Sequence, residues 1–170
     1  SGNVTLGNGA TYTGASVNTS ALSAKPMINS VEAKAATASD SDANLCFLTS
    51  GGLPTLDPAK TAGKVVVCTR GTNARVEKSL TVANAGGVGM VLVDNGAGLV
   101  AEAHSVPTVH VNAADGAAVQ AYAATAGSTA AIGVFFNGTK PAPIMASFSS
   151  RGPNQGDANM LKPDVTAPGV

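Results

Sequence analysis

Hydrolysis by a serine needs three groups brought together: the hydroxyl, a histidine that takes its proton, and a carboxylate that orients the histidine. The sequence has two histidines, His104 and His110, which share a face only if they lie on one continuous strand. Pro107 lies between them and makes that geometry doubtful. We therefore interpret both as ordinary, half-exposed strand or loop residues. A metal-binding pair and a catalytic base are the alternatives, and the sequence favours them less.

Three other patterns could carry chemistry, and each has a simpler structural interpretation. The segment 14–18 lacks the second glycine of a nucleophile loop and follows a hairpin instead of preceding a helix. The glycines at 86–89 lie between a helix and a strand, the reverse of the order in phosphate-binding loops. Asp40 and Asp42 could bind calcium weakly, but a solvated acidic loop fits them better. We predict no catalytic centre, no metal site and no cofactor in this chain.

Three tripeptides have the spelling of N-glycosylation sites, and they begin at Asn3, Asn18 and Asn137. Such tripeptides arise often by chance in a sequence rich in asparagine and threonine. The spelling alone therefore carries little weight.

The charge balance argues against nucleic acid and membrane as partners. The 170 residues include 10 basic and 10 acidic side chains, so the formal net charge is zero, without the clustered positive charge that phosphates attract. The longest nearly uncharged stretch, 103–139, is broken by proline and glycines and is too polar for a transmembrane helix. Residues 1–5 lack the features of a signal peptide, as expected of a mature secreted protein or an excised fragment.

Cys46 and Cys68 are the only cysteines. Two cysteines cannot build a zinc site without histidine, and their spacing is not Cys-x-x-Cys. A disulfide between them would stabilise the fold by roughly 3 kcal/mol in the chain-entropy model. Two buried free thiols in a cytosolic protein are the alternative, although low charge and abundant small polar residues favour an exported protein.

The centre of the chain predicts a strand–helix–strand unit. An apolar, β-branched run at 64–68 indicates a buried strand, and a second apolar run follows at 88–93. Asn73 is a plausible N-cap for a helix that runs through Ala85, with Val76 and Leu80 on its apolar face. Gly86 would end this helix.

The remaining elements predict a soluble α+β domain whose core is built from small β-branched side chains, because aromatic residues are only 4% of the sequence. Around an Asn8-Gly9 turn we expect a hairpin, and Pro107 suggests a sheet edge or strand start at 106–111. Further strands are expected from 25 and at 129–136, a helix at 112–126, and loops at 33–44 and 53–63.

Two separate stretches resemble subtilisin-like serine proteases (subtilases). The sequences ASFSSRGPN at 146–154 and LKPDVTAPGV at 161–170 closely resemble the subtilase segment that precedes the catalytic serine. The order of strands and helix in 63–95, with 106–122, resembles the protease-associated (PA) domain inserted into large subtilases. Residues 4–14 also resemble the subtilase hairpin before that insertion.

The resemblance implies a small open β-barrel or sandwich with short flanking helices. It implies that 1–22 and 141–170 are flanking segments of a subtilase catalytic domain and that 23–140 is the PA domain. The catalytic aspartate, histidine and serine would then lie outside this chain, which would not be an enzyme by itself. The resemblance also implies a secreted, extracellular protein in which Cys46 and Cys68 are paired.

The function implied is assistance in substrate recognition or access beside a protease active site. The expected partners are the catalytic domain of the same protease and a protein or peptide substrate. An alternative is a protein–protein interaction module that forms a homodimer or shields the cleft. A candidate peptide-binding edge lies at Val106, Thr108 and His110, where backbone groups could pair with an added strand.

Overall fold

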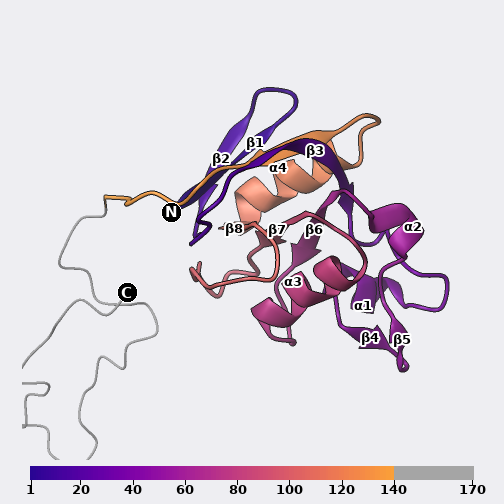
Figure 1. The fold of residues 1–170 in the computed structure, drawn as a ribbon. Coiled ribbons are helices and arrows are strands. Elements are labelled where there is room, and N and C mark those ends of the chain that lie inside the picture. The colour runs from indigo at the N-terminus through magenta and orange to yellow at the C-terminus, as the bar shows by residue number, and fades with distance from the viewer. Residues whose placement is uncertain (140–170) are drawn as a thin grey trace, which may run out of the picture. The chain divides into compact units, whose positions relative to one another are not determined.

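The fold comes from a computed structural model that describes residues 1–139; the subtilase-like motifs at 146–170 and the predicted flank 141–170 lie outside them. Residues 1–137 form one unit (Figure 1). Its elements in chain order are β1 (Gly2–Leu6), β2 (Thr11–Gly14), β3 (Leu22–Asn29), α1 (Asp40–Asn44), β4 (Thr49–Ser50), β5 (Leu53–Pro54), α2 (Pro58–Thr61), β6 (Val65–Thr69), α3 (Arg75–Asn84), β7 (Gly89–Val93), β8 (Thr108–Val111), α4 (Ala113–Ala123) and β9 (Thr129–Ile132).

The main sheet has seven strands in the order β2-β1-β9-β3-β6-β7-β8. The strands from β2 to β3 pair antiparallel, and those from β3 to β8 pair parallel. Parallel neighbours need a crossover connection. The predicted strand–helix–strand unit supplies one of them, as β6, α3 and β7.

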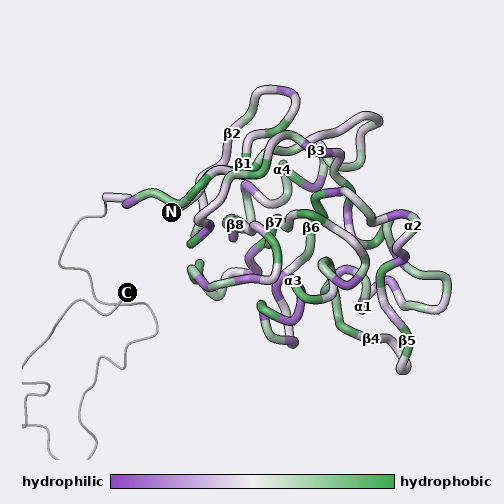
Figure 2. Tube along the Cα trace, viewed as in Figure 1, coloured by the Kyte–Doolittle hydropathy of each residue, from purple (hydrophilic) through white to green (hydrophobic). Residues whose placement is uncertain are grey.

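The central parallel strands β6 and β7 are apolar on both faces because helices cover both faces. Successive side chains of β6, β7 and β8 point to opposite faces, and hydrophobic residues follow β6 and β7 in Figure 2. One face packs on α4 through Val65, Val67, Val91, Val93, Val109, Val111, Val119 and Ala123. The other packs on α3 and the disulfide loop through Cys46, Leu56, Val66, Cys68, Val82, Ala85, Met90 and Leu92.

The two ends of the sheet are joined by one backbone bridge. Just after β2, Ala15 exchanges two backbone hydrogen bonds of 2.9 Å with His110 in β8. One bridge is too little to make a continuous strand pair, so the sheet is strongly curled but is not a closed barrel. The predicted α+β class with an open barrel-like sheet is confirmed.

Two predicted loops contain short elements. The 33–44 segment ends in α1, and its alanines Ala33, Ala38 and Ala43 are buried. The 53–63 segment contains β5 and α2, which Asp57 caps by accepting from the N–H of Ala59. Alanine lacks the contrast that reveals an apolar face, so periodicity could not detect this packing.

The prediction for the face of α3 is wrong. Val76 and Leu80 are 46% and 41% exposed, whereas Lys78, Ser79 and Val82 are buried. Asn73 does not cap the helix, whose N-cap residue is Ala74. Instead, the ammonium of Lys78 donates to the Asn73 side-chain carbonyl and, at 2.5 Å, to the backbone carbonyl of Leu45.

Because the ammonium of Lys78 is buried, we predict that the free energy of unfolding rises as the pH becomes alkaline. Burial lowers the pKa of Lys78 from 10.5 to about 8, with Glu77 opposing the shift. Between these values the unfolded chain binds more protons than the folded one, so the free energy of unfolding rises with pH. Urea denaturation from pH 7.5 to 10.5 should show this rise relative to Lys78→Met, and parallel curves for the two proteins would contradict it.

Among residues 1–139, no helix combines the length and the apolar character needed to cross a membrane.

Candidate functional site

The expected peptide-binding edge at Val106, Thr108 and His110 is already occupied. The backbone carbonyl of Thr108 accepts hydrogen bonds from the Ser16 hydroxyl at 2.8 Å and the Asn18 amide at 3.1 Å. The Thr108 N–H donates to the Asn18 side-chain carbonyl at 2.9 Å. The backbone of His110 is paired to Ala15, and the side chains of Thr108 and His110 are buried. The structure therefore contradicts the expectation that the backbone of β8 is free to pair with a peptide.

Cys46 and Cys68 form a disulfide, as predicted, and both are fully buried. The bond joins the end of α1 to β6. Cys46 occupies the left-handed position after the helix, with φ of 46°, where glycine is usual. The N–H groups of Cys46 and Phe47 close the helix by donating to Ala43 and Asp42.

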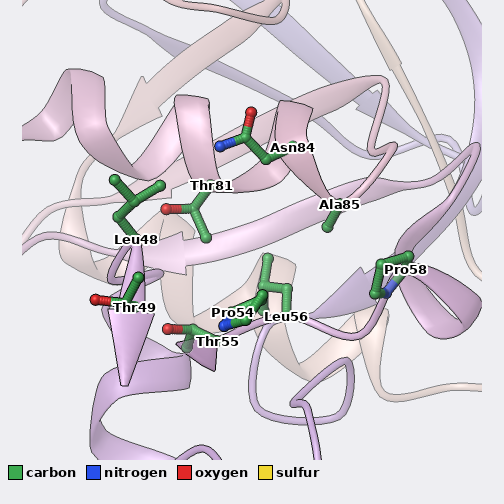
Figure 3. A pocket seen from close by; sticks show the side chains of 9 residues that line it. All are labelled: Leu48, Thr49, Pro54, Thr55, Leu56, Pro58, Thr81, Asn84 and Ala85. Atoms are coloured by element: carbon green, nitrogen blue, oxygen red, sulfur yellow. The ribbon is translucent and has the colours of Figure 1, made fainter. Parts of the chain in front are cut away.

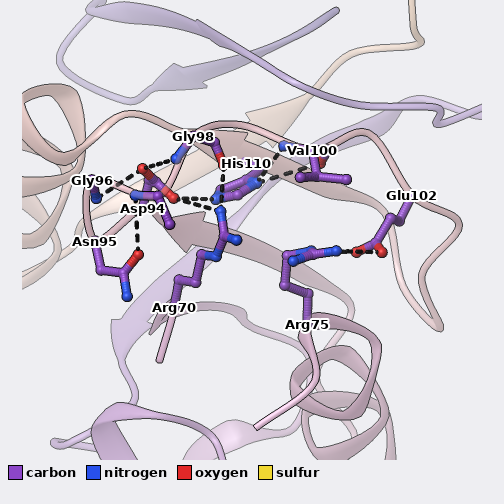
Figure 4. A network of polar contacts seen from close by, with 10 residues as sticks. Arg70, Arg75, Asp94, Asn95, Gly96, Gly98, Val100, Glu102 and His110 are labelled. Carbon is purple, nitrogen blue, oxygen red and sulfur yellow. Dashed lines mark hydrogen bonds and ion pairs between the residues drawn. The ribbon is translucent and has the colours of Figure 1, made fainter. Parts of the chain in front are cut away.

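A buried carboxylate organises the loop that joins β7 to β8 (Figure 4). Asp94 accepts hydrogen bonds from the N–H groups of Gly96 at 2.9 Å and Gly98 at 3.0 Å. It also pairs with the guanidinium of Arg70 at 3.0 Å and lies 3.3 Å from Nε2 of His110. Burial raises the pKa of Asp94, but the bonds from Gly98, Arg70 and Gly96 outweigh it and hold this pKa below the ordinary value.

His110 is buried, not half-exposed as predicted. Its Nδ1 accepts a hydrogen bond of 3.1 Å from the N–H of Val100, which leaves the proton of the neutral ring on Nε2. Nε2 lies 3.3 Å from Asp94 but outside hydrogen-bond geometry. Burial lowers the pKa of His110, chiefly by disfavouring the charged ring. This histidine therefore fixes the β7–β8 loop in place.

His104 is half-buried, as predicted, and its Nδ1 lies 3.1 Å from the hydroxyl of Ser79. The nearby carboxylate of Glu102 is held by two bonds of 2.6 and 2.7 Å to Arg75 (Figure 4). Within residues 1–139, His104 lies beside a serine but has no hydrogen bond to a carboxylate that would orient it. His110 lies beside the Asp94 carboxylate but has no hydrogen bond to a serine in this part of the chain.

The acidic residues 40 and 42 are engaged in local contacts. Asp40 pairs with Lys34 at 2.5 Å, and Asp42 accepts from the Ser50 hydroxyl at 2.6 Å. Across the described part of the chain, no group of three potential metal ligands comes together.

A pocket of about 360 Å³ lies between α3 and the chain from β4 to α2 (Figure 3). Its wall mixes apolar and short polar side chains: Leu48, Thr49, Pro54, Thr55, Leu56, Pro58, Thr81, Asn84 and Ala85. The buried hydroxyl of Thr55 has no hydrogen-bond partner among the described residues. No local sequence pattern predicts this pocket, because much of one wall comes from the segment 53–63, whose prolines and glycine predict a loop.

Residues 18–119 match the sequence profile of the family described as "PA domain". The chain belongs to this family. Its PA domain lies in a segment that is 48% identical over 177 residues to the subtilisin-like protease SBT5.3 of Arabidopsis thaliana, covering 99% of this chain and 22% of that protein. It is also 44% identical over 174 residues to the subtilisin-like protease SBT1.7 of the same plant, covering 97% and 22%.

The chain thus spans about a fifth of the length of these curated relatives. Solved structures with a similar fold include a zinc aminopeptidase from Bacillus subtilis, with TM-score 0.51 and 17% identity over 78% of this chain and 29% of that one. An aminopeptidase from Aneurinibacillus sp. strain AM-1 has TM-score 0.53 and 15% identity, covering 79% and 30%. At these identities the likeness concerns the fold alone.

Proposed function

We propose that this PA domain is a non-catalytic part of a secreted subtilisin-like serine endopeptidase and assists its recognition of protein substrates. The observation that carries the proposal is the 48% identity to a subtilisin-like protease across nearly the whole chain. The bond-cutting groups then belong to other parts of the parent protein. The buried disulfide supports export, because disulfides persist in oxidising compartments.

The pocket beside α3 is the proposed contact with substrate. The edge of β8 cannot accept a peptide strand while residues 15–18 occupy it. The pocket instead offers the exposed side chains of Leu48 and Pro54 to an apolar side chain, and the exposed amide of Asn84 to a polar group beside it. An unfolded substrate segment presents an apolar side chain next to polar backbone groups, which suits such a pocket.

Titration of the labelled chain with an unfolded protein that lacks disulfides, such as β-casein, tests this contact. Amide shifts in the NMR spectrum should gather at Leu48, Thr55 and Leu56, and the amides of β8 should not move. Shifts centred on β8, or no shifts at millimolar casein-derived peptide, would contradict the proposed contact.

The second candidate function is dimerisation of the parent protease, and the exposed face of α3 favours it. Val76 and Leu80 are exposed and lie one turn apart on α3. Leu48 is also exposed, and its N–H donates to the carboxylate of Glu77 on the same helix at 3.0 Å. Such an apolar face is suited to a protein contact. Sedimentation should then show a concentration-dependent dimer that Leu80→Asp abolishes, whereas a strict monomer excludes this function.

A further inference from the structure

The three glycosylation-like tripeptides lie in different environments. N-linked glycans are bulky and hydrophilic, so a folded protein tolerates them only where the asparagine amide reaches solvent. The hydrogen bonds of each asparagine therefore decide which of the three can carry one.

Asn18 cannot carry a glycan in the folded protein. Its amide nitrogen donates to the carbonyls of Thr108 at 3.1 Å and Gly133 at 3.5 Å. Its side-chain carbonyl accepts from the Thr108 N–H at 2.9 Å. A sugar on this nitrogen would replace one of its two hydrogens and would have to fit between β8 and the end of β9.

Asn3 lies in β1, which is paired on both sides by β2 and β9. Its side-chain carbonyl accepts from the Thr13 hydroxyl at 2.8 Å, and the residue is only partly exposed. A glycan here would have to rise from the middle of a regular sheet, packed between neighbouring side chains.

Asn137 is different in each of these respects. It follows the last described backbone pairing, in which the N–H of Phe136 donates to Ser1 at 2.8 Å. Asn137, Gly138 and Thr139 are all exposed and lie outside helices and strands.

We infer that Asn137 carries an N-linked glycan and that Asn18 stays unmodified. The residues just before Asn137, Val134, Phe135 and Phe136, are exposed apolar side chains in succession. Exposed apolar runs promote association. A glycan one residue further along covers this run with a hydrated sugar, so that the site also protects the folded protein from aggregation.

The inference rests on the proposed export, so the full protein is produced in plant cells both with its own targeting sequence and behind an independent secretory leader. Peptide N-glycosidase A should increase the mobility of the secreted protein. Mass spectrometry should find most copies of the 137 peptide glycosylated and the 18 peptide bare. Asn137→Gln and Thr139→Ala should lose the glycan at 137 and aggregate more in light scattering, whereas Thr139→Ser should keep the glycan.

Leader-driven protein with an unmodified Asn137, or folded protein with a glycan on Asn18, would overturn the inference. If the leader-driven protein carries the glycan while the protein with its own targeting sequence stays inside the cell, only the proposed export is wrong.

Discussion

Asp94→Ala is expected to lower the free energy of unfolding by about 3 kcal/mol, because breaking a buried ion pair leaves its partners uncompensated. The Asp94 carboxylate has only 5% of its surface exposed and neutralises Arg70. It also accepts from two loop N–H groups and faces His110. Its removal therefore also frees the loop that bonds to the histidine ring. Urea denaturation at pH 7 measures the loss.

Two variants make this prediction specific. Asp94→Asn keeps the shape and one acceptor oxygen but removes the charge, so its loss should be smaller than that of the alanine variant. Glu32→Ala, at an exposed position, should change stability by less than about 0.5 kcal/mol. An Asp94→Ala protein as stable as Glu32→Ala would show that the network does not hold the fold.

The pH dependence of Asp94→Ala has a defined sign. Since the folded pKa of Asp94 is lowered, the carboxylate stabilises the fold above its ordinary pKa, and that advantage is lost as pH falls through the folded pKa. The difference between wild type and Asp94→Ala should therefore shrink in acid.

Loss of the disulfide is expected to cost about 3 kcal/mol, the value for closing a loop of this length in the unfolded chain. Cys46 and Cys68 are 22 residues apart in sequence. The variant Cys46→Gly, Cys68→Ala suits the test, since glycine keeps the left-handed position after α1 and alanine suits the buried strand. Thermal and urea unfolding of this variant and of the oxidised wild type measure the difference.

Reduced wild type is the matched control, because it keeps both side chains and loses only the bond. Its stability should fall by a similar amount. If neither reduction nor the double substitution lowers the free energy of unfolding by as much as 1 kcal/mol, the bond does not constrain the chain as described.

The sheet could be predicted where local pattern and environment agree. The runs at 65–68 and 88–93 contain no charged or polar side chain, and such runs are buried on both faces of a sheet. Pro107 also pointed correctly to an end strand, since β8 is last in the sheet order. That β8 is covered by residues 15–18 depends on contacts about 90 residues apart in sequence, which no local pattern reveals.

The buried face of α3 and the pocket could not be predicted either, because both depend on partners far apart in the sequence. Val76 and Leu80 have the spacing of a buried face, but the helix buries Lys78 because the Leu45 carbonyl, 33 residues away in sequence, accepts from its ammonium. The pocket needs Leu48 and Thr55 from one segment and Thr81 from α3. Both features depend on long-range partners that become visible only when the chain is folded.

The most direct test of substrate recognition compares kcat/KM of the parent protease on an unfolded protein and on a short peptide that reaches only the catalytic centre. Leu48→Asp places a charge at the pocket and should cost about 1 kcal/mol of contact, so kcat/KM for the protein substrate should fall about fivefold. The value for the short peptide should not change. Leu99→Asp is the control, since Leu99 is 39% exposed against 38% for Leu48 and does not line the pocket. Equal losses on both substrates, or no loss on either, would contradict a role of this domain in substrate recognition.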